Sequence, residues 1–341
     1  MSLRGRRLAL LGAALLIAET PAVVRADDGH RFSVILENDS LFFDSDKHYT
    51  QGLRIGYLGP DVEDTSDWNE PFDFLGGLLP VFPAGEKRSR RYGLSFGQSF
   101  FTPSVIAADP PDPRDRPYAG WLYLGADLLQ DTNQRMLEHV ELQVGVVGPA
   151  ALGKQVQRQW HEFIDGTEPL GWDSQLENEP GIVLSYERKW RLGLGGDGYT
   201  GIDLIPELGG SLGNVFTYGE AGVMLRFGRN LLADYGPARI RPALSGTDYF
   251  NLDYLKGDFG IYGFVGAQGR AVARNIFLDG NTFQSSPSVD KEPLVGDLQA
   301  GVSLFWSDWA RLDASVMYRT DEFEGQDEGD TIGIVSFGAS W

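Results

Sequence analysis

The chain has 341 residues, a formal net charge of −19 at pH 7, 44 glycines, 12% aromatic residues and no cysteine. The absence of cysteine excludes a disulfide framework and thiolate metal sites, and the acidic balance argues against nucleic acid as a partner. No segment after residue 26 contains 18 consecutive apolar residues, so the sequence predicts no membrane-spanning helix.

Residues 1–26 have the pattern of a cleaved signal peptide. Three arginines precede a short apolar run over residues 8–18, and Val24-Arg25-Ala26 matches a cleavage site. This segment carries four Arg and one Glu, so its removal leaves a net charge of about −22. The rest, residues 27–341, is predicted to be one exported domain.

The exported part alternates between apolar and polar or glycine residues with a period of two. Residues 139–146 and 311–319 are examples, and each gives one apolar face and one polar face. Lipid outside and a crowded lumen inside explain both faces, so we predict an all-β fold, a transmembrane antiparallel β-barrel of about twelve strands. The predicted strands are 31–38, 49–58, 91–101, 118–131, 137–148, 181–192, 199–212, 215–228, 257–273, 294–306, 309–320 and 330–341.

An even strand count places both termini in the periplasm and the loops after odd strands outside the cell. The last strand ends on Trp341, and a terminal aromatic residue is typical of outer-membrane barrels. We therefore expect a multi-pass protein of the bacterial outer membrane, present as a monomer. The segments 59–90 and 229–256 are long for periplasmic turns, and the sequence predicts no position for them.

The outward loop 149–180 departs from the β pattern. Lys154 to Ile164 is predicted to be a helix with an apolar stripe of Val156, Trp160 and Phe163. Gln157 and His161, four residues apart, are neighbours on an adjoining face. Such a helix against the barrel mouth is expected to form a lid or one wall of a site.

The tip of the first hairpin carries polar residues in Glu37-Asn38-Asp39-Ser40 and Tyr49-Thr50-Gln51-Gly52. Asn38, Asp39 and Thr50 supply the hard oxygen ligands that Ca²⁺ prefers, although Asn38-Asp39 also fits a hydrogen-bonded Asx turn. His161 is suited to take a proton near neutral pH. A bound cation and a histidine base together predict ester hydrolysis at a membrane surface.

Three other motifs match known sites by letters alone. Gly93-Leu94-Ser95-Phe96-Gly97 and Gly209-Gly210-Ser211-Leu212-Gly213 fit the serine-hydrolase elbow, which requires a strand-turn-helix context that predicted strands do not give. The glycine-rich run 193–198 has no βαβ unit around it. Two alternatives remain open: a serine-nucleophile outer-membrane phospholipase, and a passive outer-membrane channel whose charged lumen residues could equally form a salt-bridged plug. Those lumen residues are Arg54, Glu141, Glu220, Arg226 and Arg319.

Several stretches, in their order and spacing over nearly all of residues 27–341, resemble the outer-membrane lipid A 3′-O-deacylases. They are Glu37-Asn38-Asp39, Tyr49-Thr50-Gln51-Gly52, Gly97-Gln98 with Thr102-Pro103, Asp115 to Trp121, Val147-Gly148-Pro149 with Gln155-Val156-Gln157 and His161, Trp172 to Asn178, and Arg319 to Gln326.

The resemblance implies a hydrolase that removes the 3′ acyl chain of lipid A in lipopolysaccharide, at a site between the barrel wall and an extracellular loop helix. The family's proposed mechanism is similar to that of phospholipase A2, with a calcium oxyanion hole and a histidine that activates water. Carried over, His161 is the base and Gln157 its neighbour, while Asn38, Asp39 and Thr50 form the cation side.

One departure from the family concerns the second external loop, where a lysine is thought to assist. Residues 104–117 contain only Arg114 and Arg116 as cations. An acidic residue that follows the histidine in the family aligns near Thr167, with Glu168 next to it. The departure affects the expected positioning of the substrate.

Overall fold

The computed structural model describes residues 29–42, 47–84, 88–196, 199–240, 249–251, 255–306 and 309–341. In these ranges thirteen strands form one antiparallel sheet. The strands are β1 (Arg31–Asn38), β2 (His48–Leu58), β3 (Arg88–Thr102), β4 (Ala119–Thr132), β5 (Met136–Val147), β6 (Glu179–Trp190), β7 (Leu192–Gly196), β8 (Thr200–Gly213), β9 (Phe216–Arg229), β10 (Phe259–Asn275), β11 (Leu294–Trp306), β12 (Ala310–Arg319) and β13 (Asp330–Ser340).

The sheet closes on itself into a barrel of twelve wall positions. β1 pairs with β13, and β6 pairs with β8 over Val183–Lys189. β7 continues the path of β6 beyond Arg191 and pairs with the next stretch of β8. The predicted twelve-stranded barrel is therefore confirmed, with the predicted strand 181–192 divided into β6 and the start of β7. The predicted signal peptide lies outside the described residues.

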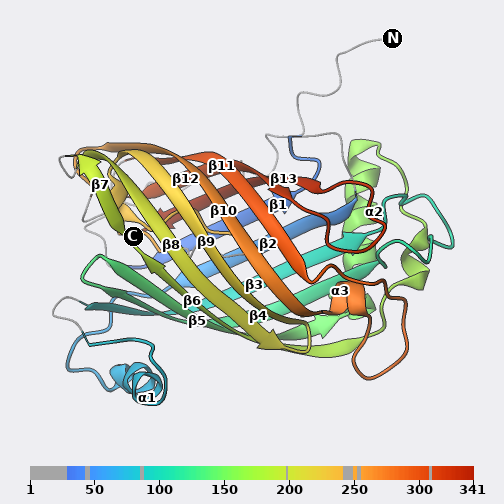
Figure 1. Ribbon diagram of the computed structural model, residues 1–341, viewed down its shortest axis with the longest axis horizontal. Helices are drawn as coiled ribbons and strands as arrows, with labels where there is room; N and C mark the ends of the chain where they lie inside the picture. The colour runs from blue at the N-terminus through green and yellow to red at the C-terminus, as the bar shows by residue number, and fades with distance from the viewer. Residues whose placement is uncertain are drawn as a thin grey trace, which may run out of the picture.

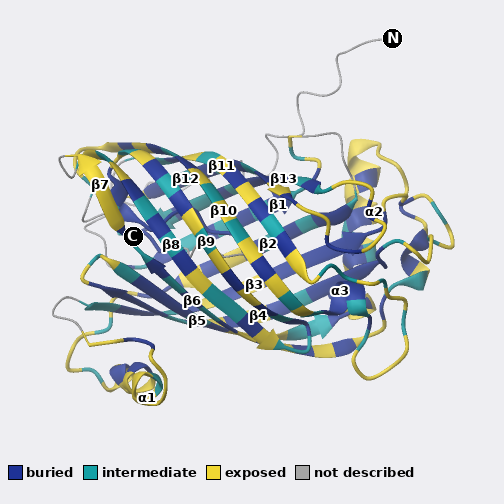
Figure 2. Cartoon of the chain, viewed as in Figure 1, coloured by how far each residue is buried: buried dark blue, intermediate teal, exposed yellow. Residues whose placement is uncertain are grey.

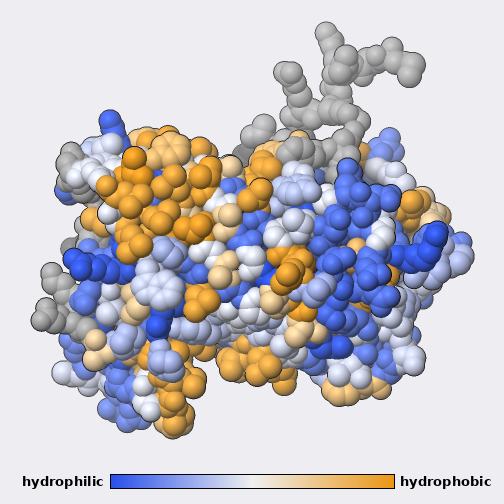
Figure 3. All heavy atoms as spheres, viewed as in Figure 1, coloured by the Kyte–Doolittle hydropathy of each residue, from blue (hydrophilic) through white to orange (hydrophobic). Residues whose placement is uncertain are grey.

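Buried and exposed side chains alternate along the strands, as Figure 2 shows for the strands nearest the viewer. In β12, Arg311, Asp313 and Ser315 are buried in the lumen, while Tyr318 on the opposite face is exposed. On the face drawn in Figure 3, hydrophobic side chains gather over the half of the wall nearest the C-terminus. The alternation that the sequence predicts therefore separates an apolar outer face from a polar lumen.

The two ends of the barrel differ in what they carry (Figure 1). The loop end carries the helices η3 (Pro149–Ala151), α2 (Gly153–Ile164), η4 (Gly171–Ser174) and α3 (Ile276–Asp279). The opposite end, here called the terminal end, holds the C-terminus, η2 (Asp67–Asn69), α1 (Glu70–Leu78) and η5 (Leu231–Ala233). Among the described residues, no helix has the length and apolarity needed to cross a membrane.

The β9–β10 connection folds back into the lumen, and its residues 230–240 and 249–250, all buried except the half-buried Leu232, are here called the lumen plug. Asp234 pairs with Arg226 at 2.5 Å and with Arg311 at 2.7 Å. Further in, Glu37 Oε1 accepts a hydrogen bond from the Ile240 N–H, and Arg239 lies 3.7 Å from the same carboxylate. The barrel thus encloses its own chain, which accounts for one of the two segments that the sequence could not place.

Candidate functional site

The connection between β5 and β6 covers the outer face of the wall at the loop end. On β3, Leu94 and Phe96 are exposed, whereas Gln98, Phe100 and Thr102 continue the same face and are buried. Their burial arises because η3, α2 and η4 lie over them, with Gln98 Nε2 donating to the Ala151 carbonyl at 2.7 Å. The helix therefore lies against the outside of the barrel wall.

A glycine allows α2 to approach the wall closely. A Cβ at Gly153 would lie 2.5 Å from Trp172 Cη2 and 3.3 Å from Phe100 Cβ. Trp172 itself is fully buried, with its ring 4.8 Å from that of Tyr118 and 6.2 Å from that of Phe100. Any larger residue at Gly153 would push the helix away from this aromatic cluster.

The predicted helix is confirmed, but the face that it turns toward the barrel is the polar one. Gly153, Gln157 and His161, spaced four residues apart, are its buried residues. Trp160 is 41% exposed and Phe163 71% exposed. Val156, the first residue of the predicted stripe, is half-buried and packs on Phe100, Tyr118 and Trp172. Trp160 and Phe163 turn outward, where the adjoining outer wall is itself apolar.

Gln157 and His161 are held in place by groups that follow the helix. The Trp172 Nε1–H donates to Gln157 Oε1 at 2.7 Å, and His161 Nδ1–H donates to the carbonyl oxygen of Thr167. This second bond fixes the tautomer of the imidazole, so that proton acceptance falls to Nε2. A polar hollow of about 320 Å³ lies beside His161 and is lined by Arg158, His161, Glu162, Asp165, Gly166, Glu168 and Pro169.

The first hairpin carries its three predicted ligands near its tip. Asn38 Nδ2 donates to the Thr50 carbonyl at 2.9 Å, and the Ser40 N–H donates to Asn38 Oδ1 at 2.8 Å. The second bond is the Asx turn that the sequence offered as an alternative. Asp39 is buried and accepts from the Lys47 N–H.

The oxygen chemistry of this hairpin fits a calcium ion. An amide oxygen, a carboxylate and a hydroxyl lie at neighbouring positions, and they include one formal negative charge. The amide of Asn38 turns its nitrogen toward Thr50, so its oxygen points to the side of Ser40. A cation bound there would share or replace the Ser40 hydrogen bonds.

Strand β3 connects the hairpin to the helix. The Thr50 hydroxyl bonds to the Thr102 hydroxyl at 2.7 Å. Thr102 and Phe100 lie two residues apart on one face, about 7 Å by strand geometry, and Trp172 packs on Phe100. The structure therefore brings the hairpin tip and the polar face of α2 to the same sector of the outer wall.

The two arginines of the second external loop have different environments. Arg116 is fully buried, pairs with Glu322 at 3.1 Å and lies over the Phe101 ring. Arg114 is exposed and pairs with Asp112, and this hydrogen bond lowers the pKa of Asp112 to about 2. Only Arg114 is placed to meet an external anion. Near the helix, Glu168 pairs with Arg158 at 2.9 Å.

A second polar constellation at the loop end escaped the sequence analysis. His48 Nδ1–H donates to Asp330 at 2.7 Å, and His48 Nε2 lies 2.9 Å from Ser104 Oγ. His48 and Asp330 are buried, whereas Ser104 is exposed. Asp115 faces the same imidazole at 3.8 Å. Because 282 residues separate His48 from Asp330, no local spacing could reveal this group.

The two serine motifs lie within strands, as expected. Ser95 of β3 and Ser211 of β8 are buried in the lumen, where Ser95 donates to Glu141 and Ser211 bonds to Ser185. Neither has the strand-turn-helix context that exposes a nucleophile.

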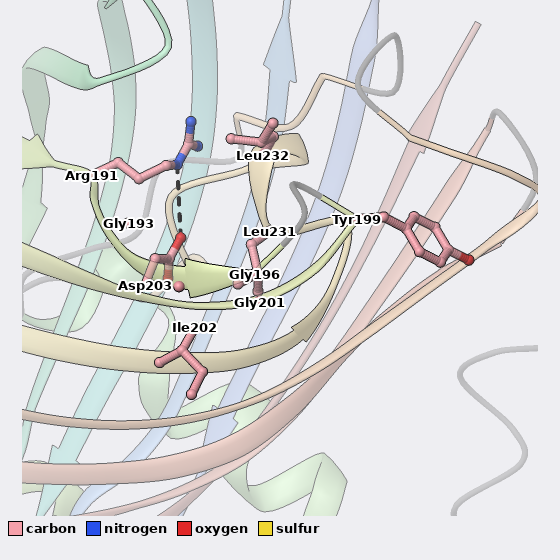
Figure 4. A pocket seen from close by; sticks show the side chains of 10 residues that line it. Arg191, Gly193, Gly196, Tyr199, Gly201, Ile202, Asp203, Leu231 and Leu232 are labelled. Carbon is pink, nitrogen blue, oxygen red and sulfur yellow. Dashed lines mark ion pairs between the residues drawn. The ribbon is translucent and has the colours of Figure 1, made fainter.

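The glycine-rich run borders a hollow of about 310 Å³ at the terminal end (Figure 4). The cation there, Arg191, lies 3.9 Å from Asp203 and 4.0 Å from the ring centre of Tyr235. Its guanidinium also donates to the carbonyls of Gln134 and Asp234. The guanidinium is therefore already engaged, which argues against a phosphate site.

In the described part of the chain, one group of His, Asp and Glu side chains is close enough to share a metal ion. Asp127, His139 and Glu141 meet in the lumen, away from the helix and the hairpin tip. Arg54 lies 3.6 Å from both carboxylates, and His139 Nε2 is 2.7 Å from Asp127. The positive charge of Arg54 takes the place that a cation would have, so this cluster is a lumen ion-pair network.

Comparisons with known proteins identify the family from a family model and the fold from a solved structure. A family model described as outer membrane protein LpxR matches residues 8–341. Among solved structures, LpxR from Salmonella typhimurium superposes with a TM-score of 0.71 at 20% identity, covering 91% of this chain and all of that one. The β domain of the Bordetella autotransporter BrkA gives 0.44 at 13% identity, covering 92% and 98%. No curated protein matches the chain in sequence.

Proposed function

Because the chain belongs to the family of the outer membrane protein LpxR, we propose that it is a carboxylic ester hydrolase that removes the 3′ acyl chain from lipid A in the outer leaflet. The observation that carries the proposal is the polar face of α2. Gln157 and His161 are buried against the outer wall, while Trp160, Phe163 and Ile164 of the same helix are exposed. A lipid substrate reaches this position directly from the membrane.

His161 acts as the general base. Its Nδ1–H is held by the Thr167 carbonyl, so Nε2 takes a proton from water as the water oxygen attacks the acyl carbonyl. The imidazolium then returns the proton to the departing sugar oxygen, and the products are a free fatty acid and a hydroxyl group. With Oε1 bound to Trp172, Gln157 presents its NH₂ as the donor end beside the base.

Asn38, Asp39 and Thr50 would hold the Ca²⁺. When bound, the ion supplies positive charge for the oxyanion that develops on the acyl carbonyl. The chain's own contribution is to fix these oxygens on one hairpin, through the Asn38–Thr50 and Thr50–Thr102 hydrogen bonds. Arg114, the exposed cation of the second external loop, is the candidate contact for a lipid A phosphate.

The alternative of a passive channel has less support. The lumen plug and its ion pairs, Arg226–Asp234 and Arg311–Asp234 among them, occupy the interior. The charged lumen residues therefore form ion pairs that fill the barrel, in line with the expectation of a salt-bridged plug.

The test uses the purified full-length protein with lipid A and measures released fatty acid. His161→Ala and added EDTA should each abolish release, and Ca²⁺ should restore it after EDTA. His30→Ala, a histidine near the terminal end that stacks on Trp341, is the matched control and should keep full activity. Undiminished release by both His161→Ala and the EDTA-treated protein would refute the proposal.

A second candidate mechanism is favoured by Ser104, His48 and Asp330. The order hydroxyl, imidazole, buried carboxylate at 2.9 and 2.7 Å is that of a hydrolase triad. In this alternative the enzyme is a serine-nucleophile phospholipase. Ser104 Oγ attacks the ester carbonyl, the lipid alcohol leaves with the serine proton passed on by His48, and water then hydrolyses the acyl-enzyme to the free fatty acid. Asp115 weighs against it, because its carboxylate lies 3.8 Å from His48 Nε2, the same nitrogen that faces Ser104.

A fluorophosphonate probe separates the two mechanisms. Labelling that is lost in Ser104→Ala and retained in His161→Ala would support the serine mechanism. If hydrolysis persists in Ser104→Ala and the protein takes up no label, the serine mechanism is excluded.

A further inference from the structure

The β2–β3 connection, which the sequence could not place, folds along the outside of the wall at the terminal end. Residues in register across β3–β6 form rows on the outer face. One row is Tyr92, Leu128, Val140 and Tyr186, and Phe72 of α1 packs on it. The next row toward the terminal end is polar and consists of Arg90, Gln130, Glu138 and Arg188.

The polar row holds the connection in place. Arg90 pairs with Asp73 at 2.7 Å and donates to the Asn69 side chain at 3.0 Å. Glu138, fully buried, accepts from the Phe82 N–H at 3.0 Å. Charged side chains on the outer wall are thus covered and paired, so α1 has a fixed position against the wall.

Four large apolar side chains of this connection are exposed, from Trp68 of η2 to Leu79 just after α1, although the Trp68 ring also contacts Tyr92 of the wall at 5.5 Å. Trp68 and Phe74 are each 67% exposed, Leu78 is 65% exposed and Leu79 is 54% exposed. These four residues are here called the α1 apolar face. Hydrophobic side chains gather at the position of α1 at the lower left of Figure 3. Four large apolar side chains on a segment of twelve residues are costly to leave in water.

The wall above α1 is too short to fill an apolar bilayer band by itself. On β3, only Leu94 and Phe96 are exposed between Tyr92, which meets α1, and Gln98, which is covered at the loop end. Six residues span about 20 Å along the strand, or about 15 Å along the membrane normal at a tilt of about 40°, whereas the apolar band of such barrels is about 25 Å tall. The rest of the apolar band falls at the levels of α1 and α2, where both helices expose apolar side chains.

We propose that the α1 apolar face inserts into the phospholipid leaflet on the side of the chain termini and completes the lipid-facing belt beneath β3–β6. The occupant is lipid because the face continues the exposed apolar wall of Leu94, Leu142 and Leu184. The helix then lies in the membrane interface and anchors this sector of the barrel below the site. The inference depends on the barrel's place in the outer membrane and not on its hydrolytic activity.

The test attaches one spin label to each of several variants that carry a single introduced cysteine, which is possible because the chain contains no cysteine of its own. Phe74→Cys reports on the α1 apolar face, Leu94→Cys on the lipid-facing wall, and Asp64→Cys on an exposed position of the same connection. Each labelled protein is reconstituted in phosphatidylethanolamine–phosphatidylglycerol vesicles. Collision rates with oxygen, which concentrates in lipid, and with a water-soluble nickel chelate are then measured.

The oxygen-to-nickel ratio at Phe74 should match that at Leu94 and exceed that at Asp64 severalfold. A ratio at Phe74 equal to that at Asp64 would overturn the proposal and would instead favour a soluble protein partner for this face. Heat-modifiable migration in gels confirms that each variant is folded before the comparison. The hydrolysis assay is separate, so failure of one proposal is distinguishable from failure of the other.

Discussion

Trp172→Phe tests whether the wall side of α2 orients the proposed catalytic groups. The substitution keeps an aromatic ring between Phe100 and Tyr118 but removes the Nε1–H that donates to Gln157 Oε1 at 2.7 Å. Gln157 is buried, and a buried acceptor that loses its donor costs about 1–3 kcal/mol. If this hydrogen bond holds Gln157 in its reactive position, its loss should lower kcat/KM for deacylation by roughly fivefold to a hundredfold.

The assay is fatty-acid release from lipid A, with thermal unfolding measured in parallel. The barrel wall does not depend on this bond, so Tm should fall by only a few degrees and the protein should stay folded at the assay temperature. Trp309→Phe, a partly exposed tryptophan that contacts Trp306 and Phe337 outside the site, is the matched control and should retain activity. Wild-type kcat/KM in Trp172→Phe would refute the claim that this hydrogen bond positions Gln157.

Three further predictions concern the barrel itself. Replacing residues 232–256 with a short Gly-Ser linker should raise ion conductance in planar bilayers above that of the wild type, because the lumen plug is removed; equal conductance would show that the plug does not close the lumen. Burial raises the pKa of Glu322, but the positive charges of Arg319 and Arg116 outweigh burial and lower the pKa below its ordinary value. The stability that this carboxylate contributes is therefore complete above about pH 4.3 and is lost as the pH falls through the lowered pKa. Glu322→Gln should remove that part of the acid sensitivity of Tm. Glu138→Ala removes the acceptor of the Phe82 N–H and of the Tyr186 hydroxyl, and one of the acceptors of Arg188, which keeps the Pro80 carbonyl. Each buried donor left unsatisfied costs about 1–3 kcal/mol, so limited proteolysis should then cut the β2–β3 connection faster than in wild type.

The strands and the loop helix were predictable because their signals are local. An alternation with period two gives both the existence of a strand and the face that it buries, as in β5, where His139 and Glu141 point into the lumen as expected. Gln157 and His161 were predicted as neighbours because residues four apart on a helix share a face, and both are buried.

The orientation of α2 was not predictable from its own residues. An apolar stripe turns inward when water surrounds a protein, but Trp160 and Phe163 turn outward here. Whether the stripe turns inward or outward depends on whether water or lipid surrounds the helix, and the sequence of the helix does not specify its surroundings. For the same reason α1 could not be placed, since its contacts are rows of side chains from four strands.

The sequence by itself determined a closed barrel of twelve strands, a helix in the third outward loop, and the candidate residues of the proposed hydrolytic site. Only the tertiary structure decided that the β9–β10 connection fills the lumen, that α2 lies against the outer wall with its polar face inward, and that His48 meets Ser104 and Asp330. The physical reason is the separation along the chain over which each interaction acts. Periodicity and capping act over a few residues, whereas the plug, the helix–wall contact and the His48 constellation join residues that become neighbours only when the barrel closes.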